Sequence, residues 1–216
     1  MIYLLDTGCF DDSFTGKVAE AEKLLFKSDK PLQGNRLTLF GRVLLGYILN
    51  RNYGIKSFSY RYGKNGKPYL ENSEVFFNIS HSGNLVLCSI SEYEIGCDIE
   101  KIRDYNPKIA KRFFAEKEAA LLADKDTEDY TFAVLWTLKE SILKKTGKGI
   151  GGGLDTYCFS DYIDNEEFYA YGCNFLRCSY GDYMISVCSE DKPQKPVIIA
   201  EKQIKDYVDE IIKKNT

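Results

Sequence analysis

The sequence predicts an α+β fold, in which helices and antiparallel strands both occur in each half of the 216-residue chain. Two observations lead to this class. Several segments carry apolar residues at helical spacing, and other segments alternate apolar and polar residues as half-buried strands do. Candidate hairpins and candidate helices occur on both sides of the midpoint. The length suits one large domain or two small ones packed together.

The first half combines one strand candidate, two helix candidates and one extended segment. In chain order these are a strand at 2–5, helices at 16–26 and 35–54, and extended chain at 57–70. Gly54 is suited to end the second helix, because glycine readily adopts the left-handed conformation found after a last helical turn. The pair Asn65-Gly66 is a strong turn signal inside the extended segment.

The rest of the chain alternates between strand and helix candidates. They are strands at 84–90 and 95–100 joined as a hairpin by 91–94, helices at 106–124 and 126–147, strands at 155–160, 167–180 and 183–189, and a tail helix from about 197. Asn106 and Pro107 suit the N-cap and first turn of the earlier helix, and Gly147 suits the end of the later one.

Composition excludes several classes of protein. Hydrophobic residues make up 44% of the chain, which is enough for a sizeable core, and the net charge of −3 lacks a basic nucleic-acid footprint. No apolar run approaches the roughly 20 residues that span a bilayer, and the start lacks the pattern of a signal peptide. The seven cysteines match no zinc or CxxC spacing. We therefore expect a reduced, cytoplasmic protein without membrane or nucleic-acid partners.

Asp98 and Glu100 lie one residue apart in a strand candidate. Residues two apart in a strand point to the same face, so both carboxylates would lie together while Cys97 and Ile99 face the core. Paired carboxylates repel each other unless a cation intervenes, and Mg²⁺ favours such oxygen ligands together with substrate phosphates. The ordinary alternative is the solvated edge of a half-buried strand.

The helix candidate at 126–147 carries a second charged group. At about 100° per residue, Trp136, Glu140 and Lys144 fall on one flank, away from the apolar face. A surface Glu140–Lys144 pair at i,i+4 is the ordinary alternative. Lys139 falls near the edge of the apolar face, where it either reaches towards a phosphate of a bound ligand or extends its stem to water.

His81, the only histidine, lies in the segment Ser80-His81-Ser82-Gly83. Small polar residues and backbone N–H groups can meet an anion there, although a single histidine is often structural. A Ser-His hydrolase is disfavoured, because adjacent Ser80 and His81 on an extended segment would point to opposite sides.

Order and spacing bring these signals together. The segments "GKNGKPYL", "FNISHSG", "IGCDIEKIR", "RFFAEKEAALL" and "LWTLKESILKKTGKGI" follow one another between about Gly63 and Phe159. This series closely resembles the 4′-phosphopantetheinyl transferase superfamily, and in particular its long, single-chain, surfactin-synthetase-activating type. The patterns G-x-D-x-E and W-x-x-K-E-S are the specific part of the likeness. Cys97 stands where the family commonly has an apolar residue, and it should face away from the metal.

The resemblance implies a reaction and an architecture. Such an enzyme transfers the 4′-phosphopantetheine arm of coenzyme A, its co-substrate, to a serine of an apo acyl, peptidyl or polyketide carrier protein. It depends on Mg²⁺ and releases adenosine 3′,5′-bisphosphate. It would be a monomer of two similar α/β halves, 1–103 and 104–216, related by a pseudo-twofold with the active site in the cleft between them.

The resemblance also assigns the charged residues of the site. Asp98, Glu100 and Glu140 would hold Mg²⁺ on the pyrophosphate, and Lys144 would bind phosphate. Either Glu118 or Glu140 would help to deprotonate the carrier serine. These roles agree with the charge that builds up when the phosphate leaving group departs.

The same likeness assigns contacts to coenzyme A. Ser80 and His81 would contact its phosphates, with His81 near the 3′-phosphate, and Lys67 and Pro68 would lie along the adenine. The family usually carries basic residues on its first helices for the 3′-phosphate, and Arg36 is the residue we expect here. Lys139 is counted among the coenzyme contacts for the reason given above.

A carrier protein is typically acidic, and a basic stretch follows the metal strand. It contains Lys101, Arg103, Lys108, Lys111 and Arg112, with Phe113 and Phe114 among them. This stretch is either a docking rim or a solvated helix face with two core phenylalanines. Two other classes stay open, namely a different Mg²⁺-dependent phosphoryl or nucleotidyl enzyme, and a non-catalytic scaffold that binds coenzyme A or a carrier protein.

Overall fold

The computed structural model describes residues 1–27, 34–149 and 153–215, and it confirms the α+β class. The helices are α1 (Asp12–Leu25), α2 (Arg36–Tyr53), α3 (Pro107–Phe113), α4 (Glu116–Leu121), α5 (Glu128–Thr146), α6 (Glu201–Asn215) and the short 3₁₀ helices η2 (Leu154–Thr156) and η3 (Ser160–Tyr162). The strands are β1 (Ile2–Asp6), β2 (Tyr60–Tyr62), β3 (Pro68–Leu70), β4 (Phe76–Ser82), β5 (Leu85–Ser91), β6 (Ile95–Lys101), β7 (Glu167–Ala170), β8 (Cys173–Tyr180), β9 (Tyr183–Ser189) and β10 (Val197–Ile198).

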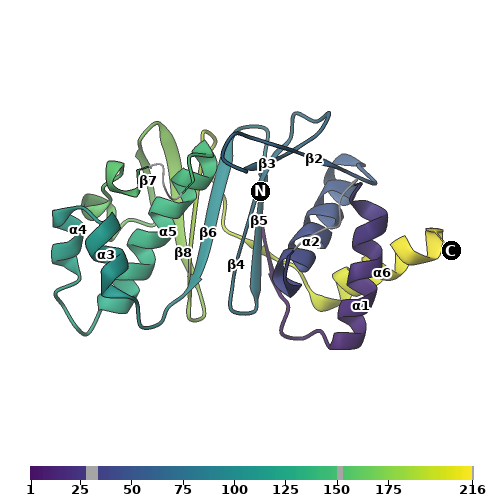
Figure 1. Cartoon of the computed structure of the whole chain (residues 1–216), viewed down its shortest axis with the longest axis horizontal. Coiled ribbons are helices and arrows are strands. Elements are labelled where there is room, and N and C mark those ends of the chain that lie inside the picture. Colours follow the sequence, from purple (N-terminus) through teal and green to yellow (C-terminus); the bar gives the residue numbers. More distant parts are fainter. Residues whose placement is uncertain (28–33, 150–152, 216) are drawn as a thin grey trace.

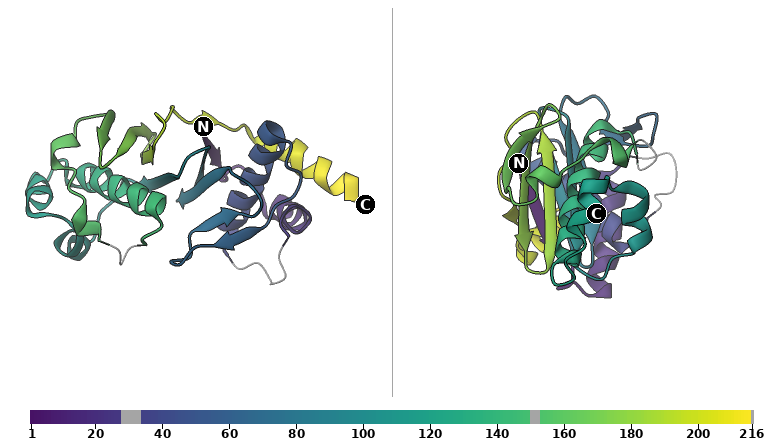
Figure 2. Two further views of the ribbon diagram at one scale, coloured as in Figure 1. Left: turned by 90° about the horizontal axis from the view of Figure 1, so that it is seen from above. Right: turned by 90° about the vertical axis from the view of Figure 1, so that its left-hand side faces the viewer.

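Two four-stranded sheets form the centre of the described structure. Their strand orders are β10-β1-β5-β4 and β6-β9-β8-β7, and β2 and β3 form a separate hairpin. Helices α1, α2 and α6 lie at one end of the molecule and α3, α4 and α5 at the other, with the strands between them (Figure 1). A view from above shows the same separation (Figure 2). None of the described helices is long and apolar enough to cross a membrane.

Local signals at the helix ends agree with the sequence. Asn35 and Asn106 cap α2 and α3, each accepting a backbone N–H with its side chain. Gly54 and Gly147 follow α2 and α5 in the left-handed conformation, with φ of 68° and 64°. Side-chain capping and glycine conformation depend on neighbouring residues alone, so these boundaries could be found without the fold.

The pairing of the strands corrects two expectations. The hairpin expected between 84–90 and 95–100 is wrong, because β5 pairs with β1 and β4 whereas β6 pairs with β9. The segment 76–82, which we did not assign as a strand, is β4 and forms the actual hairpin with β5. Strand partners are chosen by the edges that meet in space, so a short connection along the chain does not decide them.

The expected boundary at residue 103 does not coincide with the division between the sheets. Strand β6 precedes that boundary but lies in the sheet built otherwise from the second half, and β10 returns to pair with β1. Helix α6 then packs on α1 and α2. Each sheet and its helices therefore combine segments from both halves of the sequence.

Two further elements differ from the expectation. The helix expected over 106–124 is broken into α3 and α4, and Phe114 between them adopts an extended conformation. The strand expected at 155–160 is absent from the described part of that segment, where η2 and η3 occur instead. In the first segment Phe114 is buried and stacks on Phe132 of α5, and in the second Phe159 is buried against Phe175 of β8. Tertiary packing thus outweighs the local periodicity in both.

Three apolar clusters hold the described structure together. One lies between α1, α2, α6 and the first sheet, and another lies between α5 and the second sheet. The third joins the two sheets to each other, through side chains such as Leu87 of β5 and Ile99 of β6. Strand residues alternate between clusters, so Val86 and Cys88 face the first cluster while Leu87 faces the third. This shared cluster brings β4 and β6, and the polar residues on them, close together.

Candidate active site

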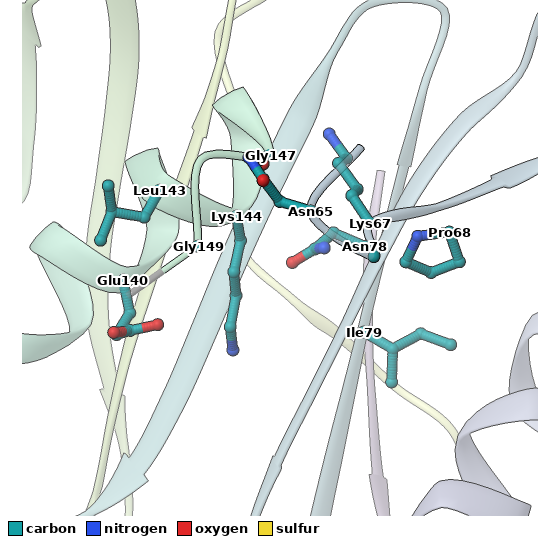
Figure 3. A pocket seen from close by; sticks show the side chains of 11 residues that line it. Asn65, Lys67, Pro68, Asn78, Ile79, Glu140, Leu143, Lys144, Gly147 and Gly149 are labelled. Atoms are coloured by element: carbon teal, nitrogen blue, oxygen red, sulfur yellow. Dashed lines mark hydrogen bonds between the residues drawn. The ribbon is translucent and has the colours of Figure 1, made fainter. Parts of the chain in front are cut away.

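A cavity of about 320 Å³ lies where β4, β6 and α5 meet. It is lined by Ile79, Ser80, His81, Asp98, Glu100, Trp136, Glu140 and Lys144. A neighbouring pocket of about 290 Å³ shares Ile79, Glu140 and Lys144 and extends to Pro68 and Gly147 (Figure 3). The structure thus brings together most of the side chains that the sequence analysis selected, although they come from three separate elements.

Strand alternation places the two carboxylates of β6 as expected. Cys97 and Ile99 are fully buried in the cluster between the sheets. Asp98 and Glu100 face α5 and line the cavity, Asp98 only 3% exposed and Glu100 half-buried. The strand therefore buries its apolar face and presents both carboxylates on the other, as the two-residue period requires.

Gly96 allows α5 to approach these carboxylates. A Cβ atom at this position would lie 2.0 Å from the backbone oxygen of Ser141 and 2.3 Å from the backbone nitrogen of Lys145. Both atoms belong to the helix backbone, so neither can move aside cheaply. The glycine of G-x-D-x-E is thus the contact point that lets Glu140 and Lys144 reach the face of β6 that carries Asp98.

Lys144 forms the most direct link between α5 and β6. Its ammonium donates to Asp98 Oδ1 at 2.6 Å and to Ser80 Oγ at 2.9 Å. Burial opposes the charge on the ammonium, but the carboxylate of Asp98 and its hydrogen bond outweigh that effect and raise the pKa of Lys144. Lys144 is therefore held as a cation at the edge of the cavity.

The carboxylates carry more negative charge than the protein neutralises. Burial, followed by the charge of Asp98, raises the pKa of Glu140 to about 7, and the same two causes raise the pKa of Glu100. Asp98 Oδ2 and Glu140 Oε1 are buried without a hydrogen-bond partner among the described residues. Unpartnered buried oxygens of this kind suit the binding of a cation, and oxygen ligands are those that Mg²⁺ prefers.

The arrangement is nevertheless not a closed metal site. Within residues 1–27, 34–149 and 153–215, no group of three or more histidine, cysteine, aspartate or glutamate side chains is placed to hold a metal ion. Lys144 occupies the side of Asp98 that faces the helix. Binding of a cation by all three carboxylates would require their side chains and Lys144 to rearrange.

Glu118 and Lys139 form a separate ion pair away from the cavity. Lys139 Nζ lies 2.8 Å from Glu118 Oε2, and both side chains are fully buried. Glu118 also accepts the N–H groups of Ala115 and Phe159, and Lys139 donates to the carbonyls of Leu154 and Tyr157. The structure gives no support to Glu118 as a base or to Lys139 as a coenzyme contact, because every charged atom of the pair already has partners.

Arg36 and Lys67 are also engaged elsewhere. The guanidinium of Arg36 donates to oxygens of Thr7, Phe10 and Thr15, and so ties the start of α2 to the loop after β1. The ammonium of Lys67 bonds to Glu94 and to the carbonyl of Lys145. These contacts do not favour Arg36 as a ligand of the 3′-phosphate or the Lys67 ammonium as an adenine contact. Lys67 instead joins the β2–β3 hairpin to the C-terminal end of α5.

Ser80 and His81 both line the cavity, but they are not bonded to each other in the way a hydrolase needs. The hydroxyl of Ser80 donates to Asp98 Oδ1 at 2.7 Å and so has no proton left for a base. His81 is half-buried on the cavity wall. This geometry disfavours a Ser-His hydrolase pair.

The sequence analysis gave no role to Asn78, and it named Ser82 only within a small polar segment that could meet an anion. Asn78 and Ser82 alternate with Ile79 and His81 in β4, and their side chains bond to β6. The signal was present as a row of polar residues two apart, beside a strand that carries two carboxylates. It could not be interpreted without knowing that β4 and β6 lie side by side.

Comparisons with known proteins find relatives that match part of this chain. A family model described as the 4′-phosphopantetheinyl transferase superfamily matches residues 94–195. The chain is 39% identical over 134 residues to 4′-phosphopantetheinyl transferase Sfp of Bacillus subtilis, and the alignment covers 60% of each protein. It is 40% identical over 118 residues to 4′-phosphopantetheinyl transferase gsp of Aneurinibacillus migulanus, which covers 50% of this chain and 49% of that relative. The chain thus matches about half to three fifths of the length of these two relatives.

The chain also aligns with part of a solved structure. The holo-[acyl-carrier-protein] synthase of Thermotoga maritima is 19% identical and aligns with a TM-score of 0.32, covering 47% of this chain and 65% of the synthase. A score this low does not support a comparison of the two folds.

Proposed function

We propose that the chain is a member of the 4′-phosphopantetheinyl transferase superfamily and that it transfers the 4′-phosphopantetheine arm of coenzyme A to a serine of an apo carrier protein. The observation that carries this proposal is the convergence of Asp98, Glu100, Glu140 and Lys144 on one cavity. A non-catalytic scaffold would gain nothing from this cluster, in which burial and then the charge of Asp98 raise the pKa values of Glu140 and Glu100.

The proposed reaction is a displacement at phosphorus. The serine oxygen of the carrier forms a new bond to the phosphorus that bears the pantetheine arm, and the bond from that phosphorus to the bridging oxygen breaks. Adenosine 3′,5′-bisphosphate leaves with the electron pair, and the serine proton passes to a base. The difficult requirement is to neutralise the charge that develops on the phosphate oxygens.

In our proposal the cavity residues bind the metal ion, bind phosphate and accept the serine proton. Asp98, Glu100 and Glu140 would hold Mg²⁺, which when bound supplies positive charge beside the diphosphate. Lys144 is the protein's own cation at the cavity and would move from Asp98 towards a phosphate oxygen. Glu140 is the proposed proton acceptor, because both oxygens of Glu118 already accept hydrogen bonds, whereas Glu140 Oε1 has no partner among the described residues and its side chain lines the cavity.

Coenzyme A would bind across the two adjoining pockets. His81 lies on the wall of the cavity that holds the carboxylates, where it can meet a phosphate. The neighbouring pocket is mainly apolar, and Pro68, Ile79 and Leu143 line it where a flat adenine ring could lie (Figure 3). Arg36 and Lys139 are left out of this assignment because their charged groups are bonded elsewhere.

The carrier protein would approach from the side of α3. Lys101, Arg103, Lys108, Lys111 and Arg112 are all exposed there, near a cavity of about 410 Å³ that Glu100 and Trp136 line. The sequence analysis left open that the phenylalanines of this stretch belong to the core. This holds for Phe114, which is buried and stacks on Phe132. An exposed basic surface beside the active site would attract an acidic partner.

The proposed location is a reducing compartment such as the cytoplasm. All seven cysteines are free thiols, and four of them are buried. Buried thiols used as small apolar residues are typical of a protein that does not meet oxidising conditions.

Intact-protein mass spectrometry tests the proposed function. An apo acyl carrier protein is incubated with this protein, coenzyme A and Mg²⁺, and the mass should increase by one phosphopantetheine arm. The increase should vanish with EDTA or with Asp98→Ala. Asp206→Ala removes an exposed carboxylate on α6 that pairs with Lys202, and it should not change the result.

Two other outcomes would contradict the proposal. Coenzyme A binding without any mass increase on acyl, peptidyl or polyketide carriers would favour the scaffold. Neither binding nor transfer would show that the site serves a different ligand.

A further inference from the structure

Strands β4 and β6 belong to different sheets, yet side chains join them along their length. Asn78 Oδ1 accepts the backbone N–H of Cys97 at 3.0 Å. Ser80 Oγ accepts that of Ile99 at 3.4 Å, and Ser82 Oγ accepts that of Lys101 at 3.1 Å. Alternate side chains of β4 therefore satisfy donors on the edge of β6 that a neighbouring strand's backbone would ordinarily accept.

The two serines in this row also donate to the carboxylates of β6. Ser80 Oγ donates to Asp98 Oδ1 at 2.7 Å, and Ser82 Oγ donates to Glu100 Oε2 at 2.9 Å. A hydroxyl carries one proton, so accepting a backbone N–H on one side leaves that proton to point at the carboxylate. Each serine thus fixes one carboxylate oxygen relative to the backbone of the strand that carries it.

We propose that Ser82 is a positioning residue that restricts the side-chain conformations of Glu100 and so favours its binding of a divalent cation. Ser82 is 9% exposed, whereas Glu100 is only half-buried and has more rotamers to lose. The hydrogen bond removes this freedom before the cation arrives, and so lowers the cost of binding. The inference rests on the metal role that the proposed function gives to Glu100.

Ser82 gives a cleaner test than Ser80. Ser80 also accepts the ammonium of Lys144 at 2.9 Å, so its removal would disturb a second charged group. Ser82 contacts Glu100 and the backbone of Lys101 in this network. A change at Ser82 therefore reports on one carboxylate.

The experiment measures binding of Mn²⁺ alone to the full chain, by the electron paramagnetic resonance signal of the free ion. Ser82→Ala should weaken binding by about 10-fold or more, which is typical when a hydrogen-bond partner of a metal ligand is removed. Ser82→Thr keeps the hydroxyl and should stay within about threefold of the wild type. Ser189→Ala removes another buried hydroxyl, which donates to the carbonyl of Glu94, and should leave binding unchanged.

Kinetics then separate positioning from a general structural role. In Ser82→Ala the Mg²⁺ concentration for half-maximal activity should rise by the same factor as the Mn²⁺ dissociation constant, while kcat at saturating Mg²⁺ should stay within about threefold. A loss of kcat that Mg²⁺ does not restore would overturn the inference.

The outcomes distinguish this inference from the proposed function. Wild-type binding with an unchanged Ser82→Ala affinity would overturn the inference alone. No Mn²⁺ binding by the wild type would overturn both the metal role and the inference. If Ser82→Ala does not fold, Ser82→Cys decides, because it keeps the size of the side chain but donates weakly. Weakened binding by Ser82→Cys supports the inference, and unchanged binding overturns it.

Discussion

Helix α5 carries two lysines, Lys139 and Lys144, that each pair with a carboxylate. The two ion pairs differ in their burial and in their remaining hydrogen-bond partners. Lys139 and Glu118 are fully buried, and each charged atom of that pair has further hydrogen-bond partners. Lys144 also bonds to a carboxylate, but its side chain is 28% exposed, and buried oxygens of Asp98 and Glu140 have no hydrogen-bond partner within the described part of the chain. The difference shows that a satisfied ion pair stabilises a fold, whereas a pair with spare acceptors leaves room for a ligand.

The largest expected effect is the loss of stability when the Glu118–Lys139 ion pair is broken. Glu118→Gln should lower the free energy of unfolding by about 3–5 kcal/mol, because it leaves the buried ammonium of Lys139 without a countercharge. Urea unfolding measures this change. The control Glu116→Gln alters an exposed carboxylate on the same helix, α4, and should change stability by less than about 0.5 kcal/mol. Loss of activity in Glu118→Gln with unchanged stability would reinstate Glu118 as a base.

A substitution in the Lys144–Asp98 pair should lower activity more than it lowers stability. Lys144→Met should lower kcat by about 10²–10³-fold, because it removes the protein's own cation from the developing phosphate charge. The free energy of unfolding should fall by less than it does in Glu118→Gln, since Ser80 still donates to Asp98. Steady-state kinetics and urea unfolding give the two values. Lys145→Met, which removes a cation next along α5 that pairs with Glu190, is the matched control. Equal loss of stability in Lys144→Met and Glu118→Gln would remove the distinction between the two pairs.

The smallest expected effect is a pH dependence of the metal-free protein. The pKa of Glu140 is raised from its ordinary value near 4.5 to about 7. The folded state therefore holds a proton that the unfolded chain loses between these pH values, and stability falls as pH rises through this window. In EDTA, Glu140→Gln should be more stable than the wild type by about 1–2 kcal/mol at pH 8, with little difference near pH 4.5.

Urea unfolding at the two pH values checks this expectation. Saturating Mg²⁺ should reverse the order at pH 8, because the wild type alone keeps all three carboxylates that we propose as ligands. A Glu140→Gln variant that is no more stable than the wild type in EDTA at pH 8 would show that the buried carboxylate carries no such penalty.

Local rules predicted a good part of the site. The shared face of Asp98 and Glu100 follows from the two-residue period of a strand, and the burial of Cys97 and Ile99 follows from the same period. Glu140 and Lys144 lie one turn apart on a helix, so their common flank could be placed from the sequence. Each of these inferences needs one element only.

Longer-range contacts were beyond such rules. The positions of Glu118 and Lys139 in the sequence do not tell a catalytic pair from a structural one, because the answer depends on the N–H and carbonyl groups of distant segments. Likewise, Lys67 precedes a proline in a motif that suggested adenine, and its ammonium reaches instead across to Glu94 and the end of α5. Burial and pairing decide such cases, and both are properties of the folded chain.

By itself the sequence determined the class of fold, the ends of the main helices, the likeness to a family and the residues around which a site could form. Spacing within one element and the identity of neighbouring residues carry that information, since backbone geometry is periodic. The tertiary structure alone decided that β6 pairs with β9, that Gly96 admits α5 against it, and that Asn78, Ser80 and Ser82 border the same carboxylates. Those facts depend on which apolar surfaces are buried together, and this burial depends on contacts between residues that are distant in the sequence.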